Sequence, residues 1–188
     1  WNPRSEPDGV VFTNLVAALG PRLPPDAIVT LAAGTFGAPF YRKIEWRPGQ
    51  RLLAPISGAM GYGMPAAVAA ALRHPGRPVI CAVGDGGFLM TGGELAVAAA
   101  RGAGLKVLLS ENGSYGSIRI HQERAHPGRT SGTDLVNPDL AAIGAAYGYP
   151  VMAVSAEHEV PALLDALVGK GPLFAVVHPA LNAVLPRK

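Results

Sequence analysis

Two apolar runs, each followed at once by an oxygen-bearing side chain, constrain the fold of this chain more than any other feature. Val79–Val83 leads into Gly84-Asp85-Gly86, a helical stretch follows, and Leu105–Leu109 then leads to Asn112, 27 residues after the Asp. Continuous apolar runs of this kind are typical of parallel strands that are buried on both faces. Because the carboxyl ends of neighbouring parallel strands lie at one edge of a sheet, where open α/β folds bind ligands, we expect Asp85 and Asn112 to lie side by side.

The chemistry of this pair indicates a divalent cation. An Asp carboxylate, an Asn carbonyl and a free backbone carbonyl are hard oxygen ligands, which suit Mg²⁺ that is also held by phosphates. A Gly-Asp-Gly alone is more often a tight turn, so the indication depends on Asn112 after the next strand. The motif is not a dinucleotide fingerprint, since Leu89 stands where the final Gly belongs, and no Gly-Lys-Ser/Thr follows as in a Walker loop.

The rest of the chain alternates between strand and helix patterns. Apolar spacing predicts a helix over 8–19 that is ended by Pro21, and Thr91 with Glu94 has the spacing of a capping box that begins a helix running to about Ala103. Residues 34–49 and 119–134 are predicted to be irregular. Further strands are expected at 28–31, 52–56, 151–154 and 173–177, and further helices at 65–73, 138–147 and 160–168. This alternation predicts a single α/β domain over 1–188, a three-layer sandwich of about six mostly parallel strands with helices on both faces.

Composition narrows the kind of partner. The chain is 49% apolar but only 15% charged, whereas globular domains carry about 25% charged residues, so we expect apolar surface to be covered in an oligomer. A net charge of +3 without a long basic run argues against nucleic acid, and no apolar run approaches the ~20 residues of a membrane helix. The polar segment 1–9 does not resemble a secretory signal, and Cys81 reads as a core residue, so a cytoplasmic location is expected.

The pattern Gly84-Asp85-Gly86 followed by Asn112 resembles the diphosphate-binding motif of thiamine-diphosphate (ThDP) enzymes. The resemblance implies the ThDP-binding fold, in which Asp85, Asn112 and the backbone carbonyl of Ser114 hold Mg²⁺ on the diphosphate of the cofactor. One departure is visible, because the family usually has two Asn residues where this chain has Glu111 before Asn112. The resemblance covers nearly the whole chain, as the carboxy-terminal, diphosphate-binding domain of an acetolactate-synthase-like enzyme.

Two further segments are similar to the same family. In Ser57–Ala67, Met60 matches the bulky residue that bends the cofactor, and the carbonyl of Gly58 and the amide of Met60 would bond the aminopyrimidine ring. Gly34-Thr35-Phe36 lies where relatives place a segment beside the diphosphate, and Thr35 is the weaker match within it. The same resemblance implies that His121 and Gln122 face the substrate. The remaining cofactor contacts are expected from Gly84, Asp85, Gly86, Gly87, Asn112, Ser114, Tyr115 and Gly116.

The resemblance implies carboligation or decarboxylation of a small-molecule 2-oxo acid, with the acyl donor and acceptor left open. In this family a Glu from a separate pyrimidine-binding domain, normally in a neighbouring subunit, protonates the aminopyrimidine. We find no such domain in these 188 residues, so the chain is expected to be catalytically incomplete without that domain or subunit, in a homo- or hetero-oligomer. The alternative is a non-catalytic binding or assembly module that kept the ThDP fold.

Overall fold

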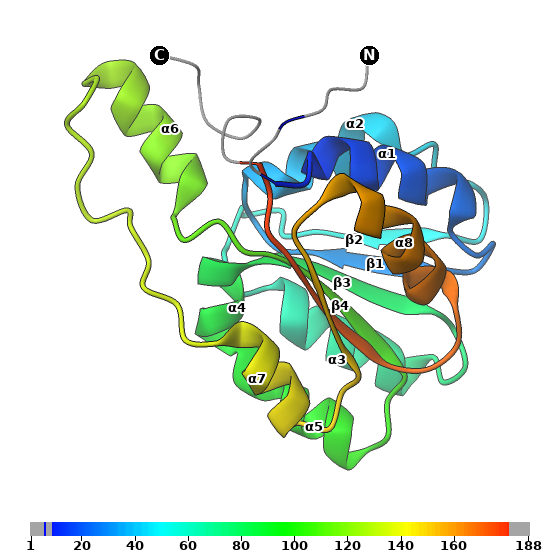
Figure 1. Cartoon of the computed structure of the whole chain (residues 1–188). Helices are drawn as coiled ribbons and strands as arrows, with labels where there is room; N and C mark the ends of the chain where they lie inside the picture. Colours follow the sequence, from blue (N-terminus) through cyan, green and yellow to red (C-terminus); the bar gives the residue numbers. More distant parts are fainter. Residues whose placement is uncertain (1–5, 7–8, 181–188) are drawn as a thin grey trace.

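The core of the molecule is one parallel β-sheet. The computed structural model describes residue 6 and residues 9–180, and within them six strands form a sheet in the order β2-β1-β3-β4-β6-β5 (Figure 1). Every neighbouring pair is parallel. The strands are β1 (Ile28–Leu31), β2 (Arg51–Leu53), β3 (Val79–Gly84), β4 (Leu105–Ser110), β5 (Val151–Val154) and β6 (Leu173–Val177). The predicted α/β architecture is confirmed.

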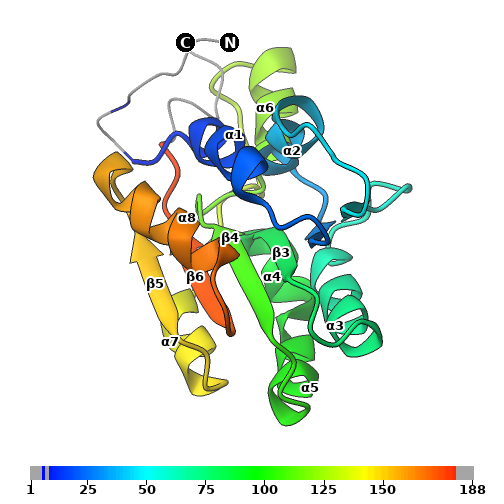
Figure 2. The ribbon, with the colours of Figure 1, turned by 90° about the vertical axis from the view of Figure 1, so that its right-hand side faces the viewer.

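Helices cover both faces of this sheet, which gives the three layers that were expected (Figure 2). One layer consists of α1 (Phe12–Arg22), α2 (Ala38–Lys43) and α8 (Val160–Val168). The other consists of α3 (Gly63–Arg73), α4 (Asp85–Thr91), α5 (Leu95–Ala100) and α7 (Leu140–Ala146). Three short 3₁₀ turns, at Thr35–Gly37, Gly92–Glu94 and Glu157–Glu159, precede α2, α5 and α8. None of the helices in the described residues is long and apolar enough to cross a membrane.

The continuous apolar runs are explained by these two layers. Along β3, Ile80 and Ala82 pack into the core beneath α1 and α8, whereas Val79, Cys81 and Val83 pack into the core beneath α3 and α5. Successive side chains of a strand point to opposite faces, so a strand that is covered on both sides needs apolar residues at every position.

Two segments that were predicted to be irregular contain helices. Between 34 and 49, α2 forms because buried Phe40 packs against Phe12 of α1, and Pro39 suits the first turn of a helix. Between 119 and 134, the prediction is wrong for the first part, where α6 (Gly116–Ala125) projects away from the sheet in Figure 1. Its residues carry no apolar stripe, so periodicity gave no signal.

Two predicted helix boundaries are also wrong. Helix α1 continues through Pro21 to Arg22, because a proline in the last turn removes only one helical hydrogen bond. Thr91 does not cap a helix. Its hydroxyl donates to the carbonyl of Gly61 at 2.7 Å, and the helical segment begins earlier, at Asp85.

Candidate functional site

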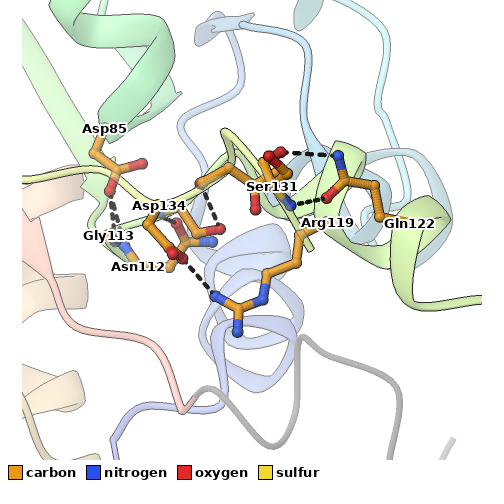
Figure 3. Close-up of polar contacts among 9 residues, drawn as sticks. Asp85, Asn112, Gly113, Arg119, Gln122, Ser131 and Asp134 are labelled. Carbon is orange, nitrogen blue, oxygen red and sulfur yellow. Dashed lines mark hydrogen bonds and ion pairs between the residues drawn. The ribbon is translucent and has the colours of Figure 1, made fainter. Parts of the chain in front are cut away.

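A buried carboxylate joins the ends of β3 and β4. Asp85, the first residue of α4, is only 2% exposed. Its Oδ1 accepts a hydrogen bond from the amide of Gly86 at 2.9 Å. Its Oδ2 accepts from the amides of Asn112 at 3.1 Å and Gly113 at 2.7 Å (Figure 3), and from Nδ2 of Asn137 at 2.9 Å. Four N–H donors thus compensate the burial of this charge.

The segment after β4 turns sharply, and hydrogen bonds to a later part of the chain hold it in place. Oδ1 of Asn112 accepts the amide of Ser114 at 3.0 Å, and Gly113 supplies the positive φ of +62° that this turn requires. The hydroxyl of Ser114 and the amide of Tyr115 both donate to the carbonyl of Thr133, at 2.9 and 2.8 Å. This pairing with a segment about twenty residues further along the chain holds the turn in place.

These elements surround one cavity with a volume of about 310 Å³, which falls at the lower end of the range for small-molecule sites. It lies at the carboxyl ends of β3 and β4. The structure brings together there all eleven residues expected to contact a cofactor: Thr35, Gly58, Met60, Gly84, Asp85, Gly86, Gly87, Asn112, Ser114, Tyr115 and Gly116. Gly34 and Phe36, which flank Thr35 in the segment expected beside the diphosphate, also line the cavity. Four further lining residues were not predicted, namely Ala33, Ser110, Ser117 and Ile118.

Comparison with known proteins identifies the family. Residues 32–178 match the family model described as "Thiamine pyrophosphate enzyme, C-terminal TPP binding domain". The chain belongs to this family. It is 31% identical over 170 residues to the acetolactate synthase isozyme 2 large subunit of Escherichia coli (strain K12), covering 89% of this chain and 31% of that protein.

Other relatives show the same partial coverage. The chain is 32% identical over 189 residues to the putative acetolactate synthase large subunit IlvX of Mycobacterium tuberculosis, covering 95% of this chain and 36% of that protein. It is 44% identical over 92 residues to the acetolactate synthase large subunit of Lactococcus lactis, covering 48% and 16% respectively. The chain therefore spans about a third of the length of the Escherichia coli subunit and of IlvX. It is a ThDP-binding domain of the acetolactate-synthase-like kind.

The oxygens at the cavity fit the Mg²⁺ that the family resemblance implies. Asp85 Oδ1 accepts only the Gly86 amide, so it keeps a lone pair, and Oδ1 of Asn112, a residue of the same wall, accepts only the Ser114 amide. The carbonyl of Ser114 accepts the amide of Gly116 at 2.8 Å and has a second lone pair. Among the described residues, no group of three or more His, Cys, Asp or Glu side chains could hold a metal. A cation here would therefore draw on amide and backbone oxygens, as Mg²⁺ can.

Gly86 leaves room for the ring of Tyr115 in the cavity wall, which leads to a test by substitution. A Cβ at Gly86 would lie 2.6 Å from the ring of Tyr115, whereas a Cβ at Gly93 would meet nothing within 4 Å. We expect Gly86→Ala to displace the Tyr115 ring, to cost about 1–3 kcal/mol of unfolding free energy, and to lower ThDP affinity. Gly93→Ala is the matched control and should change neither quantity appreciably. Thermal unfolding and calorimetric titration measure the two effects, and equal ThDP affinities for the two variants would contradict the assignment.

The two residues that were expected to face the substrate are not part of this cavity wall. His121 and Gln122 are on α6, and neither is among the residues that line the cavity. The Gln122 amide instead clamps the following loop, donating to the carbonyl of Ser131 at 2.9 Å and accepting its amide at 3.0 Å (Figure 3). Arg119 of the same helix pairs with Asp134 at 2.8 Å. A role for His121 and Gln122 toward substrate therefore stays a prediction, which these contacts do not support.

Sequence reasoning missed Asn137. Its Nδ2 donates to two carboxylates, Oδ2 of Asp85 at 2.9 Å and Oε1 of Glu111 at 3.1 Å. Oε2 of Glu111 in turn lies 3.8 Å from Nδ1 of His178, at the end of β6. Asn137 therefore separates two acidic groups that would otherwise face each other directly. Glu111, the departure from the usual Asn-Asn pair, is accommodated by this bridge.

Proposed function

We propose that this chain anchors Mg²⁺–ThDP in an acetolactate-synthase-like enzyme that carries out carboligation or decarboxylation of a 2-oxo acid. One observation carries the proposal. Asp85 and Asn112 follow neighbouring parallel strands and line the same cavity, with Asp85 held rigidly by four N–H donors. Preorganised oxygens of this kind suit a cation that bridges to a diphosphate.

The roles of the chain's own residues follow from their places around the cavity. Bound ThDP supplies an electron-accepting ring that stabilises the carbanion left when a 2-oxo acid loses carbon dioxide. Asp85, Asn112 and the carbonyl of Ser114 would hold the Mg²⁺. The backbone at Gly86 and Gly87 leaves room for phosphate oxygens near the start of α4. Met60, half-buried in the wall, would support the bent shape of the cofactor, with Gly58 beside it.

The activating Glu would come from a pyrimidine-binding domain or subunit. Among the residues that line the cavity, Asp85 is the one carboxylate, and its oxygens are already committed to N–H donors and the cation. Apolar side chains on the α3–α5 layer support a covering partner: Tyr62, Leu72, Leu89, Met90 and Val97 are all substantially exposed. We also propose that residues 1–188 form one domain of a cytoplasmic protein. The single cysteine of the chain, the buried thiol of Cys81, is in keeping with this location.

Calorimetric titration of the chain with ThDP and Mg²⁺ tests cofactor binding. We expect heat that depends on Mg²⁺, and we expect Asn112→Ala to lower the affinity at least about tenfold, equivalent to about 1.4 kcal/mol, because a metal ligand is lost. Gln122→Ala is the control, since its side chain lies outside the cavity and should leave the affinity unchanged. No heat with either the wild-type chain or Asp85→Ala would favour the alternative of a non-catalytic assembly module.

Turnover by the 188-residue chain provides a separate prediction. We expect the purified chain to bind Mg²⁺–ThDP weakly and to release no carbon dioxide from pyruvate, because no carboxylate other than Asp85 lines the cavity in the part of the chain that the structure describes. Adding a pyrimidine-binding domain from a relative should restore turnover if the two surfaces match. Measurable decarboxylation by the chain alone would contradict the proposed dependence on a second domain.

A further inference from the structure

A second cavity, of about 700 Å³, lies at the opposite end of the sheet from Asp85. It borders the first residues of β3, β4 and β6, whereas the cofactor cavity borders the last residues of β3 and β4. Its lining comes from the segments 71–78, 101–106 and 168–171, which end helices α3, α5 and α8 and lead into those strands. The volume is within the range of small-molecule sites, and no residue is shared with the cofactor cavity.

The lining of this cavity is strongly cationic. It includes Arg77, Arg101, Lys106 and Lys170, and it includes no Asp or Glu. The three helices that end here each contribute a partial charge of about −0.5 at the carboxyl terminus, which offsets only about 1.5 of the four positive charges. The helix dipoles therefore offset only part of the basic charge, and the cavity stays net positive.

Lys106 is the one buried residue among the four cationic residues of this cavity. It lies in β4 between Ile80 and Leu173 of the neighbouring strands, and it is only 3% exposed. Among the described residues its ammonium group has no hydrogen-bond or ion-pair partner, and burial lowers its pKa. Arg77 differs, because its guanidinium donates to the backbone carbonyls of Asp26 and Gly49. The stem of Lys106 is thus packed inside the sheet, while its ammonium group reaches the cavity without a partner from the described part of the protein.

We propose that this second cavity binds a phosphate monoester whose body is a planar, aromatic base. The phosphate would pair with Lys106, assisted by Arg101 and Lys170 at the rim. The body would lie against the apolar part of the wall, which is formed by Leu72, Pro75, Pro78 and Val168. An anion here supplies the partner that Lys106 lacks within the protein, through a charge-assisted hydrogen bond from its ammonium group to phosphate. The site is independent of the proposed cofactor function.

Titration of the full 188-residue chain with AMP, in the absence of Mg²⁺, tests this site. We expect the wild-type chain to bind AMP and Lys106→Met to weaken binding at least about tenfold, since Met keeps the length of the side chain and removes the charge. Arg129→Met is the matched control: it removes the same charge from an exposed loop outside the cavity, and it should leave the affinity unchanged. Lys170→Met, at an exposed position of the rim, should weaken binding by a smaller factor and provides a variant that does not alter the core.

Three outcomes would overturn the proposal. The first is that the wild-type chain shows no AMP binding up to millimolar concentrations. The second is that Lys106→Met and Lys170→Met both bind AMP as the wild type does. The third is that AMP binding survives in Lys106→Met but is lost in Asn112→Ala, since AMP would then occupy the cofactor cavity. Retention of AMP binding in Asn112→Ala, together with its loss in Lys106→Met, supports the second site.

Discussion

Replacing Asp85 with Ala is expected to destabilise the chain by about 3–5 kcal/mol and to abolish ThDP binding. The buried carboxylate accepts N–H groups of Gly86, Asn112, Gly113 and Asn137, and Ala would leave these donors without a partner. The bonds also tie the end of β3 to the turn after β4, so their loss should loosen the whole cavity wall. Chemical denaturation measures the first effect, and calorimetry with Mg²⁺–ThDP the second.

Two variants show whether the buried network is the cause. Asp139→Ala removes an exposed carboxylate that accepts one amide, that of Ala142, at the start of α7, and should cost only about 1 kcal/mol. Asp85→Asn keeps the shape of the side chain, but its NH₂ group would face some of the N–H donors. We therefore expect its loss of unfolding free energy to lie between the losses for Asp139→Ala and Asp85→Ala. If Asp85→Ala cost no more than Asp139→Ala, the network around Asp85 would not be the structural centre of the site.

The sequence predicted the pairing of Asp85 and Asn112 because a single physical rule determines it. Two buried parallel strands that are neighbours in a sheet deliver their following residues to the same edge, and the apolar runs of β3 and β4 identified both strands. The glycines beside Asp85 were also placed correctly at the cavity, since their role depends on local backbone space. Local patterns in the sequence were therefore enough to place the site residues that follow the ends of β3 and β4.

The segment from α6 to α7 could not be derived in the same way. Helix α6 has no continuous apolar face, and the Gln122–Ser131 and Arg119–Asp134 contacts hold it instead. These contacts depend on where the chain returns after the helix, which no spacing in the sequence specifies. For the same reason His121 and Gln122 were assigned to the substrate side from resemblance alone.

Asn137 was missed because it lies 52 residues from Asp85 along the chain. It reaches the carboxylate only because Ser114 and Asp134 form an antiparallel bridge that brings the returning segment against the turn after β4. A lone Asn before a proline reads as a loop residue in any sequence pattern. Its side chain is nevertheless the one that links Asp85 to Glu111 through hydrogen bonds.

Changing Asn137 to Asp is therefore expected to have an effect close in size to that of losing Asp85 itself. The substitution keeps the shape but replaces an N–H donor, 2.9 Å from Asp85 and 3.1 Å from Glu111, with a third carboxylate. Two like charges about 4 Å apart repel by about 4 kcal/mol at an effective dielectric constant near 20. We expect Asn137→Asp to lose about 3–4 kcal/mol of unfolding free energy at neutral pH.

The pH dependence of this loss distinguishes repulsion from a missing hydrogen bond. Repulsion raises the pKa of the introduced carboxyl in the folded state, so the destabilisation is fully present above that pKa and disappears as pH falls below it. Asn137→Ala loses the same bonds without adding a charge, so its cost should be smaller and should recover less on acidification than the cost of Asn137→Asp. Glu111→Gln combined with Asn137→Asp should restore part of the stability at neutral pH, because one of the three facing charges is gone. If Asn137→Asp matched Asn137→Ala at every pH, the amide of Asn137 would be a structural bond only, and would not keep the two carboxylates apart.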